Sequence, residues 1–174
     1  VSTSWGKDST VLANLAATSG LRLPLVWVRV HQWENPDCPL VRDQFLAQYG
    51  AHVDYDEITV DATAPRWWDH DAPHTAASSR TSRGGFQQAE KRHGGRHISG
   101  IRAEESRIRD MVMARWGEAG PHACRPIGRW TAVDVFAYLH HHNLPVHPAY
   151  AMSYGGQLDR RWLRVSSLGG IRGA

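Results

Sequence analysis

Residues 2–9 read Ser-Thr-Ser-Trp-Gly-Lys-Asp-Ser and stand directly before a helical pattern that Gly20 is suited to stop. The apolar residues of that predicted helix fall on one face: Val11, Leu12, Leu15 and Ala16. A helix N-terminus presents unpaired N–H groups and the positive end of the helix dipole, and Lys7 adds a full charge. The segment therefore predicts a phosphate-binding loop, with an ordinary polar turn as the alternative. It is not a Walker loop, because Asp8 separates the lysine from the serine.

The bulk composition is that of one ordinary globular domain. The chain has 174 residues, of which 41% are hydrophobic, which is enough for a single domain with a core. No apolar run approaches the roughly 20 residues that cross a bilayer, and the start shows no signal-peptide pattern. We therefore expect a cytoplasmic protein with no membrane partner. Cys38 and Cys124 form no Cys-x-x-Cys pair, so we expect reduced thiols, no zinc and no iron–sulfur cluster.

The net charge of +3 suits a small anionic ligand as well as it suits nucleic acid. The basic residues concentrate in residues 80–115 and 160–172, which favours arginines that converge on a pocket over a polyanion-binding arm. We expect most of the eight tryptophans to serve packing rather than stacking on a base.

Strand and helix patterns alternate along the chain. Strands are predicted at residues 25–30, 53–60, 97–101 and 123–127. Helices are predicted at residues 39–49, 86–93, 107–116 and 132–142. Residues 62–85 show no hydrophobic periodicity, which predicts a long loop. Thr131 and Asp134 form a capping box for the last helix. The alternation predicts an α/β fold, a doubly wound, mostly parallel sheet with helices on both faces.

We expect one nucleotide-binding domain over residues 1–174. A loop of this kind normally follows a buried strand, and only Val1 precedes residues 2–9. We therefore expect the natural protein to carry upstream residues, and trimming after Ala174 stays open.

Cations and carboxylates alternate after the predicted strand at 97–101, in the segment Gly-Ile-Arg-Ala-Glu-Glu-Ser-Arg-Ile-Arg of residues 100–109. Open α/β sheets bind ligands at the carboxyl ends of their strands. Arg102 and Arg109 could fork onto phosphate oxygens, and Glu104 or Glu105 could orient an arginine or hold a metal. The alternative is a solvated salt-bridge loop.

A third segment with distinctive residues lies at residues 125–150. It consists of Arg125-Pro126-Ile127, Trp130-Thr131, Asp134-Val135, Tyr138, Asn143-Leu144-Pro145 and Pro148-Ala149-Tyr150. Together with residues 4–9 and 100–109, it resembles the phosphoadenosine phosphosulfate (PAPS) reductase family of the PP-loop adenine nucleotide alpha hydrolase superfamily. That family carries a Ser-Gly-Gly-Lys-Asp-Ser loop, a Gly-Ile-Arg-x-x-Glu-Ser segment and a Trp-Thr-x-x-Asp-Val segment that ends in Leu-Pro-x-x-Pro-x-Tyr. Its relatives include sulfonucleotide reductases, ATP sulfurylase small subunits and enzymes that modify nucleic acids with sulfur.

The resemblance implies an adenine nucleotide cleft. The implied phosphate contacts are Ser4, Gly6, Lys7, Asp8 and Ser9. Further nucleotide contacts are expected from Ser2, Trp5, Val28, Val30, Gly100, Ile101, Arg102, Arg161 and Arg164. After the second strand the family has an Asp-Thr-Gly-like turn, whereas this chain has Val-His-Gln-Trp-Glu at residues 30–34, so only backbone contacts around Val28 to Val30 are carried over.

Trp5 stands where the family has the first glycine of the loop. Because a bulky indole does not take the positive φ that glycine tolerates, we expect the loop to bend elsewhere or to use Trp5 as a wall beside the ligand.

The C-terminal region departs from the family. Sulfonucleotide reductases that resemble this chain use a cysteine near the C-terminus as the nucleophile, whereas no cysteine follows Cys124 here. Ser166 and Ser167 could not relay a sulfur oxidation state, and whether Cys38 or Cys124 faces the cleft stays open.

We therefore expect an enzyme that binds ATP with magnesium and breaks the bond between the α and β phosphates, releasing pyrophosphate and AMP or an adenylylated acceptor. Lys7 and arginines from Arg102, Arg109, Arg161 and Arg164 would stabilise the pyrophosphate, and Asp8 with Glu104 or Glu105 would position magnesium. Two alternatives stay open: a true sulfonucleotide reductase whose catalytic cysteine lies outside this chain, and a nucleotide-sensing subunit without turnover. An acceptor or partner protein in sulfur transfer or nucleic-acid modification, and a homodimer, are compatible with these readings.

Overall fold

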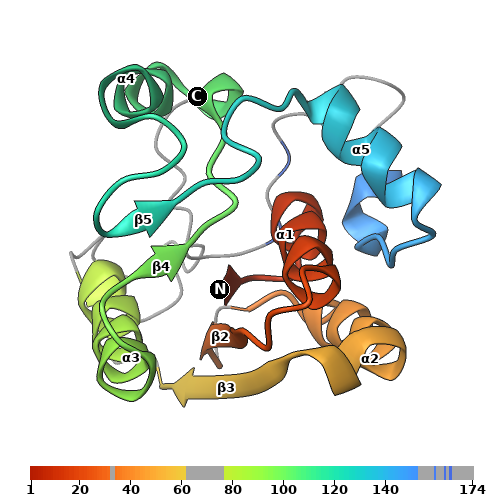
Figure 1. Cartoon of the computed structure of the whole chain (residues 1–174). Helices are drawn as coiled ribbons and strands as arrows, with labels where there is room; N and C mark the ends of the chain where they lie inside the picture. The colour runs from red at the N-terminus through yellow and green to blue at the C-terminus, as the bar shows by residue number, and fades with distance from the viewer. Residues whose placement is uncertain (32–33, 62–76, 153–158, 160–162, 164, 166–174) are drawn as a thin grey trace, which may run out of the picture.

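The computed structural model describes residues 1–31, 34–61, 77–152, 159, 163 and 165 (Figure 1). Its strands are β1 (Ser2–Thr3), β2 (Pro24–Val30), β3 (Asp54–Val60), β4 (His97–Ile98) and β5 (Ala123–Cys124). Its α-helices are α1 (Lys7–Thr18), α2 (Cys38–Tyr49), α3 (Ala77–His93), α4 (Arg107–Trp116) and α5 (Ala132–His141). Three short 3₁₀ helices are η1 (Gly50–His52), η2 (Ala103–Glu105) and η3 (Pro148–Ala151).

All the pairings between these strands are parallel. β1, β2 and β3 form one sheet in that order, with Thr3 opposite Trp27 and Val28 opposite Ile58. β4 and β5 form a second sheet. Helix α3 lies on one side of the first sheet, and α1 and α2 lie on the other (Figure 1). The α/β class with parallel strands is therefore confirmed, although the described strands form two sheets where one was predicted.

The core lies between the first sheet and the helices α1, α2 and α5. One cluster joins Trp27 and Leu25 of β2 to Phe45 of α2, and a second joins Val11 of α1 to Leu139 of α5. Helix α1 buries Val11, Leu12 and Ala16 of the predicted face, but Ala13 and Asn14 are buried as well and Leu15 is half-buried, so burial extends beyond that face. The capping box of α5 is confirmed, since Asp134 N donates to Thr131 Oγ1. None of the described helices has an apolar stretch of the length that a membrane crossing needs.

Helix α3 is the largest departure from the predicted elements. It begins at Ala77, so residues 77–85 of the predicted loop are helical. Gly84 and Gly85 lower helix propensity, but α3 crosses β2 so closely that a Cβ on Gly85 would lie 2.3 Å from Val28 Cγ1. Tertiary packing therefore requires a glycine that local propensity disfavours.

The predicted strand boundaries also change. The strands predicted at 97–101 and 123–127 are shorter in the structure, where β4 and β5 have two residues each. Ser2 and Thr3 pair with Val26 and Trp27, so they belong to β1 and the phosphate-binding loop begins at Ser4.

Candidate functional site

The loop of residues 4–9 joins β1 to α1 and is closed by its own polar groups. The amide of Ser4 donates to Ser9 Oγ (3.2 Å), and that hydroxyl donates to the carbonyl of Gly6 (3.1 Å). Gly6 is the extended N-cap of α1 and supplies no side-chain cap. The first amides of α1 are thus left for other acceptors, as in anion sites at helix N-termini.

Trp5 supports this loop from beneath. Its φ is +58° and its side chain is fully buried, with ring centroids 5.6 Å from Phe45 and 6.3 Å from Trp27. The prediction that an indole would not take a positive φ is wrong, and Trp5 is a core residue rather than a wall beside the ligand. Left-handed backbone at a non-glycine residue costs about 1–2 kcal/mol, which burial of a large aromatic ring offsets.

Lys7 and Tyr150 meet at the N-terminus of α1. The Lys7 side chain is 3% exposed, and its Nζ lies 2.9 Å from Asp8 Oδ2 and 5.6 Å from the centroid of the Tyr150 ring. The Lys7 amide donates to the Tyr150 hydroxyl (3.2 Å). Burial raises the pKa of Tyr150, so the phenol is neutral at physiological pH. Tyr150 thereby occupies one amide of the predicted anion site.

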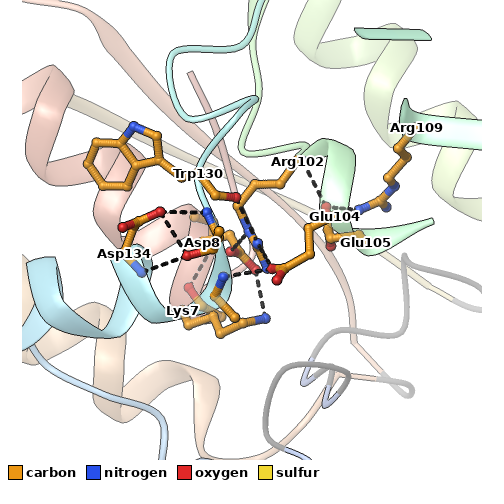
Figure 2. Close-up of polar contacts among 12 residues, drawn as sticks. Lys7, Asp8, Arg102, Glu104, Glu105, Arg109, Trp130 and Asp134 are labelled. Carbon is orange, nitrogen blue, oxygen red and sulfur yellow. Dashed lines mark hydrogen bonds and ion pairs between the residues drawn. The ribbon is translucent and has the colours of Figure 1, made fainter. Parts of the chain in front are cut away.

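Arg102 lies behind the loop and is 1% exposed. Its Nε donates to Asp8 Oδ1 (2.6 Å), while its Nη1 donates to Glu104 Oε2 (2.6 Å) and to the carbonyl of Trp130 (3.1 Å) (Figure 2). Burial by itself would lower the pKa of Arg102, but the carboxylates of Asp8 and Glu104 outweigh it and the pKa is raised. Two nitrogens of Arg102, Nε and Nη1, thus face protein acceptors, and its fork onto phosphate stays a prediction.

Glu104 and Glu105 also have protein partners. Glu104 Oε2 accepts the amide of Ala132 (2.6 Å) at the start of α5. Glu105 Oε2 accepts the Arg102 amide (2.9 Å) and pairs with Arg109 Nη1. Within the described ranges no three His, Cys, Asp or Glu side chains gather as a metal site. The predicted magnesium ligation by Asp8 with Glu104 or Glu105 needs only two carboxylates, and it stays a prediction.

The loop opens into a pocket of about 670 Å³. Predicted site residues in its lining are Ser2, Ser4, Gly6, Lys7, Asp8, Ser9, Val28, Gly100, Ile101, Glu105 and Arg109. Gly100 lies against the loop, where a Cβ would be 3.3 Å from the Asp8 backbone. The predicted residues Trp5, Val30, Arg102 and Glu104 are not in the lining. Arg161 and Arg164 fall outside the described residues.

The opposite wall of the pocket was missed by the sequence reasoning. It is formed by the end of α3 and the turn that follows: Phe86, Ala89, Glu90, His93, Gly94, Gly95, Arg96 and His97. We call these residues the far wall. His93 Nε2 lies 2.8 Å from Asp56 Oδ2. The available signal was the run His-Gly-Gly-Arg-His at residues 93–97, in which two glycines end a helix beside basic side chains.

Neither cysteine lines the pocket. Cys38 is fully buried at the start of α2, with its Sγ 3.7 Å from the carbonyl of Ser4. Burial and the neighbouring carboxylate of Glu34 raise the pKa of the Cys38 thiol, which keeps it protonated and poorly nucleophilic. Cys124 is half-buried in β5.

The described site therefore joins a helix N-terminus, a lysine and an arginine around one cavity. A sequence model of the phosphoadenosine phosphosulfate reductase domain matches residues 1–171. The chain belongs to the phosphoadenosine phosphosulfate reductase family. The family resemblance carried by residues 4–9, 100–109 and 125–150 is thereby confirmed.

A solved structure supports the fold of this family member. The crystal structure of PAPS reductase from Candida auris in complex with phosphate has a TM-score of 0.60 to this chain at 13% identity. The similarity covers 86% of this chain and 75% of that one. At this level of identity the likeness extends to the fold. No curated protein is similar enough in sequence to count as a match.

Proposed function

We propose that this PAPS reductase family member binds an adenine nucleotide in the 670 Å³ pocket and breaks the α–β phosphate bond of ATP. The volume lies within the range of small-molecule sites. The observation that carries the proposal is the composition of the lining: a phosphate-binding loop with Lys7 and Arg109, and no cysteine among the described lining residues.

The reaction is a nucleotidyl transfer. An oxygen nucleophile of the acceptor, or water, forms a bond to the α phosphorus, and the bond from that phosphorus to the bridging oxygen breaks. Pyrophosphate leaves with the electron pair, and the nucleophile gives up its proton. Lys7 and Arg109 are the catalytic residues, because both line the pocket where the leaving pyrophosphate gains charge. The amides at the start of α1 hold the same phosphates.

Magnesium would be held chiefly by the substrate. Mg²⁺ in nucleotide sites commonly uses one or two carboxylates together with phosphates and water. Asp8 fits this role, because it lines the pocket and, among the described residues, its Oδ2 is bonded only to the Lys7 ammonium, which would turn to the phosphates. Glu104 and Glu105 fit less well, because both hold backbone amides. When bound, the ion would neutralise charge on the phosphates.

Product analysis tests this proposal. Purified protein is incubated with magnesium and ATP labelled at the α phosphate, with and without tRNA as a candidate acceptor. We expect labelled AMP or adenylylated acceptor and an equal amount of pyrophosphate. Labelled ADP, or no pyrophosphate under any of these conditions, would contradict the proposal.

A second candidate is a sulfonucleotide reductase, favoured by the family match over residues 1–171. Its chemistry needs a thiol that attacks sulfur, and Cys38 is buried and protonated. Release of sulfite from PAPS with a dithiol donor would favour the reductase, and its retention in the double variant Cys38→Ser/Cys124→Ser would show that neither cysteine of this chain is the attacking thiol. Pyrophosphate release from ATP, unchanged in the variant, would favour nucleotidyl transfer.

A further inference from the structure

Six charged side chains lie beside the loop in two sets of ion pairs. Lys7, Asp8, Arg102 and Glu104 form one set, and Glu105 and Arg109 form the other, which joins the first through the backbone amide of Arg102 (Figure 2). Formal charges in this group cancel, and every cation is bonded to a carboxylate. An incoming phosphate competes with these carboxylates for the cations. A carboxylate whose cation turns to the phosphate would repel the phosphate unless another cation neutralises it.

Arg102 differs from the other two cations in burial and in bonding. Lys7 and Arg109 line the pocket, whereas Arg102 does not. Arg102 bridges Asp8 and Glu104 with two contacts of 2.6 Å and has a third acceptor in the carbonyl of Trp130. If it turned toward a ligand, Asp8 and Glu104, which are 17% and 30% exposed, would lose this cation.

Glu104 fixes the position of Arg102. The same oxygen, Oε2, accepts Arg102 Nη1 and the amide of Ala132 in the first turn of α5. A chain of short contacts therefore runs from the N-terminus of α5 through Glu104 and Arg102 to Asp8, and from Asp8 to Lys7.

We propose that Arg102 is a positioning residue whose charge neutralises Asp8, so that Lys7 can exchange Asp8 Oδ2 for a phosphate oxygen of the ligand. Glu104 holds Arg102 in place for this exchange. Arg102 itself contacts no substrate. The inference rests on the proposed function only in taking the ligand to carry phosphates at residues 4–9.

The test measures binding of inorganic pyrophosphate, without magnesium, by isothermal titration calorimetry. We expect Arg102→Met to weaken binding by about tenfold or more, because Asp8 then holds Lys7 and repels the ligand. Removing that carboxylate as well, in Asp8→Asn/Arg102→Met, should restore most of the affinity. A purely structural role for Arg102 would not give this rescue.

Two further variants keep the proposal falsifiable if Arg102→Met does not fold. Glu104→Gln keeps the acceptor for Ala132 but removes one charge from Arg102, and it should weaken pyrophosphate binding a few-fold. Asp134→Ala is the matched control, because it breaks the capping box of the same helix α5 and leaves the contacts of Arg102 intact. It should bind pyrophosphate as the unmodified protein does.

Equal losses in Glu104→Gln and Asp134→Ala, or a double variant that binds no better than Arg102→Met, would overturn the inference. Failure of the wild-type protein to bind pyrophosphate would overturn it too. Pyrophosphate binding with the expected rescue, but without cleavage of ATP, would support the inference and remove the proposed function.

Discussion

The two walls of the pocket are built differently. On the loop side the charged lining residues have fixed partners: Lys7, 3% exposed, pairs with Asp8, and Arg109, 27% exposed, pairs with Glu105. On the far wall residues 93–97 are exposed to solvent, and Arg92 beside them is 50% exposed. Fixed dipoles and charges stabilise developing charge better than solvated ones do, because they need no reorganisation. The loop side is therefore suited to chemistry on phosphates, and the far wall to recognition of the rest of the substrate.

The largest expected effect concerns the support beneath the loop. Trp5→Ala removes a fully buried indole, and we expect the free energy of unfolding to fall by about 3–5 kcal/mol in urea titrations. Trp5→Gly should be about 1 kcal/mol more stable than Trp5→Ala, because glycine tolerates the φ of +58°. Trp116→Ala, at a tryptophan that is 53% exposed, is the control and should change stability by less than about 1 kcal/mol. An equal loss of stability in Trp5→Ala and Trp116→Ala would contradict the view that Trp5 supports the loop as a core residue.

The second effect compares the chain's two lysines. Lys7→Met should lower the rate of pyrophosphate release by about 100-fold or more, because it removes a buried charge at the leaving group. Lys91→Met changes an exposed side chain near the end of α3 and should leave the rate of pyrophosphate release within about twofold of the unmodified protein's. Both are measured with a coupled pyrophosphate assay, with circular dichroism as a check on folding. A Lys7→Met enzyme of normal rate would place the chemistry elsewhere.

The third effect is a pH dependence on the loop side. His147 caps η3, which carries Tyr150, and burial lowers the pKa of its imidazole below the ordinary 6.5. As pH falls below about 6.5, the unfolded chain binds a proton that the folded chain does not, so the free energy of unfolding decreases. His147→Asn keeps an acceptor for the Ala149 amide, which donates to Nδ1 in the native protein.

We expect His147→Asn to lose about 1 kcal/mol less stability than the unmodified protein between pH 7 and pH 5. The measurement is denaturant unfolding at each pH, with His140→Asn on the exposed side of α5 as control. The same acid sensitivity in all three proteins would mean that His147 is protonated in the folded state.

The smallest effect belongs to the far wall. Arg96→Ala should raise the KM for ATP by about threefold or less and leave kcat unchanged, because an exposed cation contributes little in water. Steady-state kinetics measures both constants. A loss in kcat as large as that of Lys7→Met would show that the two walls share the chemistry.

Local patterns in the sequence predict the parts of this molecule that depend on local forces. The helix face at Val11 and Leu12 and the capping box at Thr131 and Asp134 were predictable because period and spacing determine them. The position of the loop directly before α1 was predictable for the same reason, and its binding of phosphate stays a prediction.

Other features depend on contacts between distant segments. Arg102 and Arg109 stand in one segment and have the same chemistry, yet only Arg109 lines the pocket, because Asp8 and the Trp130 carbonyl retain Arg102. The low helix propensity of Gly85 predicted a loop. In the structure Gly85 is part of helix α3, and a larger residue there would collide with the Val28 side chain. Trp5 in left-handed backbone could not be predicted without its aromatic neighbours in α2 and the sheet.

The most direct test of the account is a crystal structure with magnesium and α,β-methylene ATP, in which the bond proposed to break is replaced by one that does not. We predict the β and γ phosphates at the first amides of α1, with the Lys7 ammonium turned from Asp8 to a phosphate oxygen and Arg102 still on Asp8. Phosphates bound instead at Arg96 and His97, with Lys7 still paired to Asp8, would contradict the central claim.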